Sequence, residues 1–291
     1  MRRRRDLILA ALGAGLVAAG YVAASRAAAS VAAGALLHPS RRPVTGPPPA
    51  GCRDAEFAGD GVALRGWRCP PAGTRRGTLV YLHGSAANRS GIGGAVGRFT
   101  GRGLEVVAYD SRAQGESSGT ICTYGYWEKR DLKRVIDAVG PGPVVLLGAS
   151  LGAAVALQEA PDDRRVVGIV AAESFSDLRT VARERAPRCL TEGMIRRAFV
   201  VAEAIGDFRA DEVSPQAAAR RIHVPVLLIH GAADTETPPE HSRRIFAALG
   251  GPKALLLIEG ARHNGSLGDQ GAWHRIDRFV DDVLARAGAG E

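Results

Sequence analysis

The sequence has few of the residue spacings from which metal and nucleotide sites are built. None of its four cysteines forms a C-x-x-C pair, and no histidine-rich tract accompanies them, so no metal site is expected. The glycine-rich stretch 91–97 lacks both the G-x-G-x-x-G spacing and a G-K-[ST] sequence, which argues against a nucleotide site. We therefore expect neither a metal ion nor any other cofactor.

Lysine is nearly absent, and the basic charge is unevenly distributed. The net charge is +8, but residues 1–42 contain seven arginines against the single acid Asp6 and so contribute +6 of it. The rest of the chain contributes only +2 and has no zinc-finger spacing, RNP pattern or interleaved aromatic and basic residues. A nucleic-acid partner is therefore not expected, and membrane topology explains the N-terminal charge better.

An uncharged apolar run from Leu7 to Ala24 follows the arginines Arg2 to Arg5. As a helix it would be about 27 Å long, which is just enough to cross a bilayer. No polar positions recur at helical spacing, so a helix buried in a soluble core is a poorer explanation. Together with a second apolar stretch, Ala27 to Leu37, this run predicts that residues 1–37 form a membrane anchor or signal segment.

Two fates of this segment stay open. A retained signal anchor would make a single-pass protein of the cell membrane, with its arginines in the cytoplasm. A cleaved signal peptide would instead release a secreted or periplasmic domain, since small residues are common from Ala23 to Ser30. The stretch Arg4 to Ile8 also resembles a twin-arginine export signal. All of these predictions place the folded body outside the cytoplasm.

A proline-rich linker separates this segment from the folded part. Residues 38–51 contain five prolines, so the stretch cannot continue a helix and is expected to be extended. The domain is expected to span residues 52–291 and to begin with a hairpin. Gly59-Asp60-Gly61 predicts its turn, because it lies between the β-type runs Cys52 to Ala58 and Val62 to Cys69.

Short apolar runs then alternate with helical stretches. Continuous apolar runs are typical of strands covered by helices on both faces, so we expect a mostly parallel, doubly wound α/β sheet. The expected strands are 78–82, 104–109, 144–147, 166–171, 224–229 and 254–258, and the expected helices are 89–102, 126–138, 151–160, 239–249 and 272–286. Residues 174–221 break the alternation. Their helical pieces, 176–186 and 191–204, predict a small cap over the carboxyl ends of the strands.

Four cysteines allow three disulfide pairings in an exported domain, and unpaired thiols are a further alternative. Cys52 and Cys69 lie nearly symmetrically about the Asp60 turn, so they could face each other across the hairpin. Cys122 lies in a loop and Cys189 in the cap, where a bridge between them would attach the cap to the body. The sequence does not choose among these possibilities.

The strongest motif is Gly148-Ala149-Ser150-Leu151-Gly152, which follows an apolar strand and opens a helix. This is the strand-turn-helix context of a nucleophile elbow, in which the serine stands on a tight, strained turn. Glycines on either side let strand and helix pack closely, and the helix N-terminus adds free N–H groups and positive potential. We therefore predict that Ser150 is a nucleophile.

A serine hydroxyl needs a base to accept its proton. His263 follows the strand 254–258 and Asp234 follows the strand 224–229, so both are expected at the same rim of the sheet as Ser150. The order Ser150, Asp234, His263 along the chain fits a Ser-His-Asp triad on such a sheet. Glu173, just past the strand 166–171, is a second candidate for the acid.

Such a nucleophile also needs two backbone N–H groups to bind the oxyanion. We expect one from Leu151, next to the nucleophile, and one from Ser85, in the loop His83-Gly84-Ser85 that follows the strand 78–82. His83 is expected to order this loop rather than to act as the base.

Together these motifs resemble the serial signature of the α/β-hydrolases. The resemblance is carried by Tyr81-Leu82-His83-Gly84, Tyr109 to Ser117, Gly148 to Gly152, His230-Gly231 with Asp234 and Pro238, and His263. Over about residues 52–287 the chain is most similar to bacterial N-terminally anchored hydrolases of the serine-aminopeptidase-like and Bem46-like groups. The family usually has Arg-Gly where this chain has Arg112-Ala113, and often a glycine where it has Ala153. The resemblance implies an eight-stranded, mostly parallel sheet and cofactor-free hydrolysis of ester, thioester or amide bonds.

The predicted function is therefore that of a serine hydrolase that cleaves a carboxylic ester or related acyl bond through an acyl-enzyme. The substrate would be a small acyl compound or a peptide. A peptidase or an acyltransferase would use the same triad, so the motifs do not separate these activities. A non-catalytic, membrane-anchored binding module is the remaining alternative, and the intact serine, aspartate and histidine disfavour it.

Overall fold

The computed structural model describes residues 2–289, apart from the side chains of residues 2, 4–19 and 21. The chain forms two compact units. The smaller combines Met1–Leu37 with Ala186–Asp207, and the larger combines His38–Arg185 with Phe208–Glu291. The expected insertion 174–221 is thus divided, because only its central part belongs to the same unit as the N-terminal segment.

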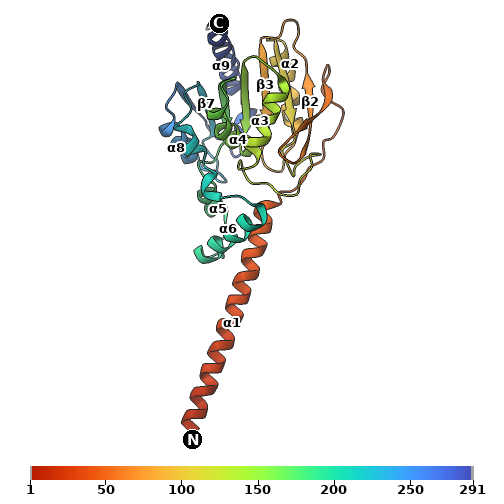
Figure 1. Ribbon diagram of the computed structural model, residues 1–291. Coiled ribbons are helices and arrows are strands. Elements are labelled where there is room, and N and C mark those ends of the chain that lie inside the picture. Colours follow the sequence, from red (N-terminus) through yellow and green to blue (C-terminus); the bar gives the residue numbers. More distant parts are fainter. Residues whose placement is uncertain (1, 290–291) are drawn as a thin grey trace. The chain divides into compact units, whose positions relative to one another are not determined.

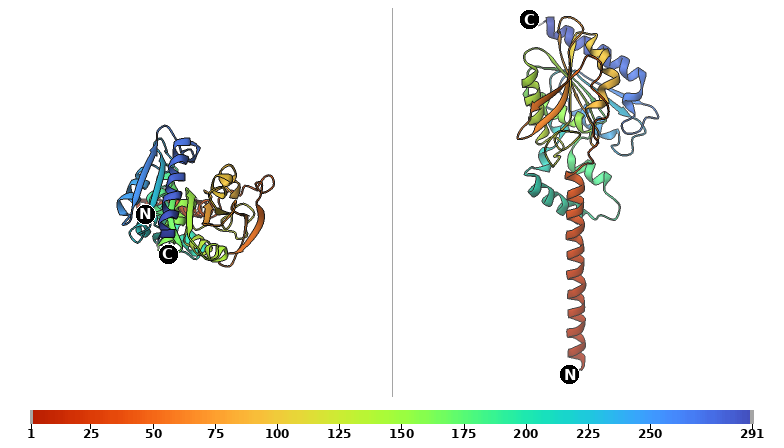
Figure 2. Two further views of the ribbon diagram at one scale, coloured as in Figure 1. Left: turned by 90° about the horizontal axis from the view of Figure 1, so that it is seen from above. Right: turned by 90° about the vertical axis from the view of Figure 1, so that its right-hand side faces the viewer.

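One eight-stranded sheet forms the centre of the larger unit (Figures 1 and 2). Its order is β1-β2-β4-β3-β5-β6-β7-β8; the pairs β1–β2 and β2–β4 are antiparallel, and all other pairs are parallel. The strands are β1 (Arg53–Ala58), β2 (Ala63–Cys69), β3 (Gly77–Leu82), β4 (Leu104–Tyr109), β5 (Val144–Ala149), β6 (Val166–Ala172), β7 (Val226–Gly231) and β8 (Lys253–Ile258). The sequence-based expectation of an α/β-hydrolase sheet is confirmed.

Helices cover both faces of this sheet. The helices of the larger unit are α2 (Val96–Thr100), α3 (Glu128–Val139), α4 (Leu151–Glu159), α5 (Leu178–Arg185), α7 (Pro215–Ala219), α8 (Glu240–Ala248) and α9 (Gln270–Ala289), with 3₁₀ turns η1 (Arg89–Ala95), η2 (Ala160–Asp162), η3 (Ala210–Glu212) and η4 (Ser266–Gly268). On β3, Val80 and Leu82 pack in one apolar cluster with residues of α3, α4 and α8. Their neighbours Leu79 and Tyr81 pack in a second cluster with residues of η1, α2 and α9. Both faces of the sheet are therefore covered by apolar side chains of helices, which explains why the strands are continuous apolar runs in the sequence.

The expected helix 89–102 is the clearest local difference from the sequence analysis. It is a 3₁₀ turn, η1, followed by the five-residue helix α2. Gly91, Gly93 and Gly94 lie within the 3₁₀ turn, and glycine costs about 1 kcal/mol relative to alanine in a helix interior. Three glycines within these seven residues explain why a regular α-helix begins only at Val96.

The smaller unit contains two helices that pack against each other, α1 (Arg2–Leu37) and α6 (Glu192–Gly206) (Figure 1). The two apolar stretches of the N-terminal segment belong to a single helix of 36 residues. Most side chains of the Leu7–Ala24 run lie outside the described residues. Among the described residues, no helix combines the length and the apolar character that crossing a membrane requires.

The proline-rich linker contains no helix, and hydrogen bonds hold it against the rest of the larger unit. The Nδ2 amide of Asn88 donates to the carbonyl oxygens of Arg42 and Pro43, each at 3.1 Å. Arg41 donates in turn to the Ser117 carbonyl at 2.9 Å and to that of Gly119. This docking could not be predicted from the sequence, because proline spacing indicates backbone conformation but not the surface that the linker contacts.

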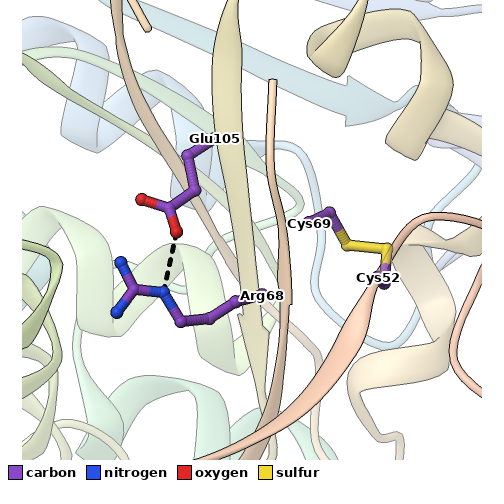
Figure 3. The surroundings of a disulfide bond; sticks show 4 residues. All are labelled: Cys52, Arg68, Cys69 and Glu105. Atoms are coloured by element: carbon purple, nitrogen blue, oxygen red, sulfur yellow. Dashed lines mark hydrogen bonds and ion pairs between the residues drawn. A yellow bond between two sulfur atoms is a disulfide. The ribbon is translucent and has the colours of Figure 1, made fainter. Parts of the chain in front are cut away.

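A disulfide joins Cys52 to Cys69, across the hairpin of β1 and β2 (Figure 3). The strand register explains the pairing, because Arg53 lies opposite Arg68 and so brings the two neighbouring cysteines together. The second possible bridge, between Cys122 and Cys189, is not formed: both thiols are free, the Cys122 thiol buried and the Cys189 thiol exposed. On the other side of β2, Arg68 donates to Glu105 at 2.7 Å (Figure 3).

Removing this disulfide should lower the free energy of unfolding by about 3 kcal/mol, because the bond closes a loop with a sequence separation of 17 residues. The test is denaturant unfolding of the Cys52→Ser/Cys69→Ser double variant. Cys189→Ser is the matched control, since its exposed thiol is free and should leave stability unchanged. Equal midpoints for all three proteins would contradict the expectation.

Candidate active site

Ser150 is the single residue between β5 and α4, and its backbone is strained. Its φ is 49° and its ψ is −111°, a conformation that costs a non-glycine residue of order 1–3 kcal/mol. A Cβ atom at Gly148 would overlap the backbone of Gly152, and one at Gly152 would overlap the Leu82 carbonyl. The glycines of the motif are therefore required for the close approach of strand and helix, as the sequence analysis argued.

The loops after β7 and β8 bring Asp234 and His263 to this turn. Gly231 allows their approach, because a Cβ there would overlap the Ala261 carbonyl. The Ser150 hydroxyl lies 3.0 Å from His263 Nε2, and His263 Nδ1 lies 2.7 Å from Asp234 Oδ2. The three residues predicted from the sequence are thus in hydrogen-bond contact, in the order that proton transfer from a serine requires.

Asp234 is buried and accepts several hydrogen bonds. Its Oδ1 receives the backbone N–H groups of Glu236 and Thr237, each at 2.9 Å, and its Oδ2 faces the nitrogen atoms of His263 and His230. Burial raises the pKa of this carboxyl, but the hydrogen bonds from His230, His263 and Thr237 outweigh it and hold the pKa well below its usual range. Asp234 therefore stays ionised near neutral pH and can stabilise a protonated imidazole.

His230 is a site residue that the sequence analysis noted only as part of a motif. It is fully buried, and its Nε2 lies 2.7 Å from the Thr237 carbonyl and 3.3 Å from Asp234 Oδ2. Both neighbours are acceptors, so this nitrogen carries a proton, while the Ser242 hydroxyl donates to Nδ1 at 2.6 Å. His230 thus contacts the same carboxylate oxygen of Asp234 as His263 does.

Glu173, the second candidate acid, contacts the loop of His263 rather than its ring. Its Oε1 accepts the Ser266 N–H at 2.9 Å, and its Oε2 accepts the Asn264 N–H. The Asp234 carboxylate, by contrast, contacts the imidazole directly. Glu173 is therefore placed to position the base.

The predicted oxyanion donors lie on either side of the nucleophile. Leu151 follows Ser150 directly, and a Cβ atom at Gly84 would stand 3.4 Å from the Ser150 Cβ, so the loop with Ser85 borders the serine. In the described chain, neither the Ser85 nor the Leu151 N–H donates to another protein group. Both are available for a ligand oxygen.

The imidazole of His83 orders the loop His83-Gly84-Ser85 through hydrogen bonds to backbone groups. It is fully buried, its Nε2 accepts the Ser111 N–H at 3.0 Å, and its Nδ1 therefore carries the proton that is donated to the Gly84 carbonyl at 2.7 Å. Burial lowers the pKa of His83, against smaller opposing effects of the Gly84 carbonyl and Asp110. Both ring nitrogens are occupied by the backbone, so His83 does not face the serine as a base.

Gln114 holds the next residue of the same loop, and the sequence analysis gave it no role. Its Oε1 accepts the Ala86 N–H at 2.7 Å, where Ala86 has a positive φ of 56°. Gln114 is itself fully buried in the segment Tyr109 to Ser117, which also contains Ala113 at a φ of 60°. That positive φ explains why the related hydrolases usually have glycine there.

Gln114→Leu should lower kcat about tenfold, because the loss of one buried hydrogen bond frees the strained Ala86 and lets the oxyanion loop move. Steady-state kinetics on an activated ester, with a melting curve for each variant, test this expectation. Gln158→Leu, at a second buried glutamine that bonds Ala154 and Tyr124 instead, is the control for burial alone. An unchanged kcat in the Gln114 variant would show that the loop holds its shape without it.

A second serine–histidine–carboxylate set shares no residue with this site. Ser176 Oγ lies 2.8 Å from His241 Nδ1, and His241 Nε2 lies 2.7 Å from Glu184 Oε2. Ser176 and His241 are both fully buried, so their hydroxyl and imidazole have no access to a substrate. Among the described residues, no three histidine, cysteine or acidic side chains are grouped to hold a metal ion.

Comparison with known proteins agrees with this architecture. The model of the alpha/beta hydrolase family matches residues 79–281. The uncharacterized protein YfhR of Escherichia coli is 28% identical over 256 residues, which cover 83% of this chain and 84% of that protein. YfhR of Salmonella typhi is 31% identical over 251 residues, covering 79% and 80%.

Solved structures share the fold at lower identity. The esterase Pf2001 of Pyrococcus furiosus superposes with a TM-score of 0.69 at 22% identity, covering 86% of this chain and 99% of that one. An acylaminoacyl peptidase of Pyrococcus horikoshii superposes with a TM-score of 0.62 at 16% identity, over 81% of this chain and 41% of that one. With a family match over more than half its length, the chain belongs to the alpha/beta hydrolase family.

Proposed function

We propose that this hydrolase is a serine esterase that cleaves a carboxylic ester, or a related acyl bond, through an acyl-enzyme on Ser150. The observation that carries the proposal is the contact of Ser150 with His263 and of His263 with Asp234, with the serine on a strained turn at the start of α4. Structural neighbours named as an esterase and a peptidase support the same reaction type.

In the proposed reaction, His263 Nε2 takes the proton of Ser150 as Oγ attacks the carbonyl carbon. The Ser85 and Leu151 N–H groups bind the oxygen that becomes negative, and Asp234 stabilises the imidazolium. The imidazolium then protonates the leaving alcohol or amine as its bond to carbon breaks. Water attacks the acyl-enzyme with His263 as base, which releases the carboxylic acid and restores Ser150.

Labelling of the full chain with a fluorophosphonate tests the activated serine. We expect one covalent adduct on Ser150, located by mass spectrometry, and hydrolysis of p-nitrophenyl esters that depends on acyl length. Aminoacyl anilides and added alcohol acceptors, assayed in parallel, separate a peptidase and an acyltransferase from an esterase. A folded protein that takes up no label would instead favour the binding-module alternative.

We also propose that residues 1–37 attach the enzyme to the cell membrane, as in the N-terminally anchored, Bem46-like hydrolases, with the catalytic unit outside the cytoplasm. The support is the arginine cluster before the uncharged run Leu7 to Ala24. Carbonate extraction of membranes and protease protection of spheroplasts test this placement. Recovery of a soluble protein that starts between Ala23 and Ser30 would show a cleaved signal peptide.

A further inference from the structure

The proline-rich linker contacts the two chain segments that form and hold the loop of the predicted oxyanion donor. One segment, residues 84–89, contains the donor Ser85, and the other, residues 110–120, contains Gln114. Linker residues 38–43 form hydrogen bonds with both segments. The linker is therefore held by the part of the domain that serves the nucleophile.

Asn88 makes the contact with the first segment. Its Nδ2 amide donates to the linker carbonyls of Arg42 and Pro43, each at 3.1 Å. Its Oδ1 accepts the Ser90 N–H at 2.9 Å and so caps the turn η1. Both ends of the amide are thus occupied, and the linker contact fixes the chain just after Ser85.

Arg41 makes the contact with the second segment. Its guanidinium donates to the carbonyl oxygen of Ser117 at 2.9 Å and also to that of Gly119. The Ser117 N–H in turn donates to the Gln114 carbonyl at 3.1 Å, which closes a tight turn. The side chain of Gln114 then accepts the Ala86 N–H at 2.7 Å. Arg41 therefore holds the turn from which Gln114 reaches the oxyanion loop.

These contacts close a ring of hydrogen bonds around the two segments. The linker contacts Asn88, the chain leads from there back to Ala86, Ala86 contacts Gln114, and the chain returns through Ser117 to Arg41. Ala86 has a positive φ of 56°, which is unfavourable for a residue with a side chain. Its conformation depends on neighbours that hold it, so the ring stabilises the loop in a shape that the local sequence does not favour.

A buried ion pair fixes the far end of the first segment. Arg89 donates its backbone N–H to Asp110 Oδ1 at 2.7 Å and its guanidinium to Asp110 Oδ2 at 2.5 Å. Asn88 lies between this end and the strained Ala86, and its side chain bonds the linker instead of the second segment. The linker thus restrains a stretch that the ion pair leaves unattached.

The hold of the linker is concentrated in its first six residues. The ring of His38 donates to the Thr120 carbonyl at 2.7 Å, which adds a third contact to those of Arg41 and Asn88. Further along, Gly46 to Pro48 line a cleft of about 750 Å³, so this part of the linker is less closely packed. Directional hydrogen bonds of residues 38–43 therefore dominate the contact.

We propose that residues 41–43 of the linker clamp the oxyanion loop, and that Arg41 and Asn88 are positioning residues for the reaction at Ser150. The inference rests on the function proposed above, because it concerns the oxyanion site of that same reaction. Arg41 acts through Gln114, and Asn88 acts through the loop itself. The linker is thus part of the catalytic unit and more than a spacer behind the N-terminal segment.

Arg41→Met in the full chain tests the clamp with an activated ester. Methionine keeps an apolar stem but loses both donors, so we expect kcat to fall about fivefold with KM and the melting temperature nearly unchanged. Arg42→Met is the matched control. In the described part of the chain its side chain has no hydrogen-bond or ion-pair partner, and its carbonyl stays available to Asn88. Arg41→Lys, which keeps an ammonium donor, should recover part of the loss.

A trifluoromethyl ketone distinguishes a loosened oxyanion site from a general loss of activity. It forms a tetrahedral adduct with Ser150 whose oxygen occupies the oxyanion site. In Arg41→Met its inhibition constant should therefore rise by about the factor by which kcat falls. An unchanged inhibition constant beside a lowered kcat would contradict the proposal.

Two further variants test the route of the effect. Asn88→Asp keeps an oxygen for the cap but turns a second oxygen toward two carbonyls, so it should lower kcat more than Arg41→Met does. In a Gln114→Leu background Arg41→Met should cost less than in the wild type, because the bond through which it acts is already lost.

Equal kcat in Arg41→Met and wild type would overturn the clamp, as would an equal loss in Arg42→Met or the same factor lost in both Gln114 backgrounds. These outcomes are distinct from a failure of the proposed function. A wild type that neither takes up the fluorophosphonate nor hydrolyses esters would overturn both, whereas an active wild type with an equally active Arg41→Met would overturn only the clamp.

Discussion

Ser150→Ala should lower kcat for ester hydrolysis by about 10⁴-fold or more and abolish fluorophosphonate labelling. Alanine keeps the turn but removes the only oxygen that lies 3.0 Å from His263 Nε2 among the described residues. The residual rate of hydrolysis would come only from the oxyanion donors and from substrate binding. Single-turnover kinetics with an activated ester, which report acyl-enzyme formation directly, measure the loss.

The chain supplies a matched control for this variant. Ser176 also contacts a histidine that contacts a carboxylate, but it is fully buried. Ser176→Ala should therefore keep kcat within about threefold and change mainly the thermal stability, because it removes one buried hydrogen bond. If the Ser176 variant were inactive and the Ser150 variant retained wild-type turnover, the assignment of the nucleophile would be wrong.

Asp234→Asn should lower kcat by about 10⁴-fold with little change in fold. The amide can no longer stabilise a positive imidazole, and its NH₂ group competes for the Nδ1 of His263 and favours the wrong tautomer. Because hydrogen bonds hold the pKa of Asp234 well below its usual range, the wild-type carboxylate is charged at all pH values where a triad is active. The loss in the variant should therefore persist across the pH profile of kcat.

Glu173→Gln is the control that separates the two candidate acids. Glutamine keeps an oxygen for only one of the Ser266 and Asn264 N–H groups and turns an NH₂ donor toward the other, so one bond is lost and the remaining one is no longer charge-assisted. We expect a loss nearer to tenfold, because the loop of His263 shifts while the base keeps its own acid. A larger loss of kcat in Glu173→Gln than in Asp234→Asn would show that Glu173, and not Asp234, is the acid of the triad.

Much of the candidate site follows from the sequence, for a physical reason. The parallel strands are covered on both faces, so they appear as uninterrupted apolar runs, and the residue after each run lies at the carboxyl rim of the sheet. Ser150, Asp234 and His263 each follow such a run, which is why their meeting could be predicted. The steric demands of Gly148 and Gly152 could be predicted too, since a nucleophile elbow leaves no room for a Cβ.

Other features depend on contacts that no periodicity records. Gln114 is a buried side chain whose role comes from Ala86, 28 residues away in the chain. The docking of the linker on Asn88, the choice of Cys52 with Cys69, and the pairing of α1 with α6 likewise each join distant segments. By itself, the sequence determined the sheet, the turn of the nucleophile and the rim on which the three residues meet, because local sterics and apolar patterning specify them. Only the tertiary structure decided which polar groups support that site, because this support depends on side chains that folding brings together from across the chain.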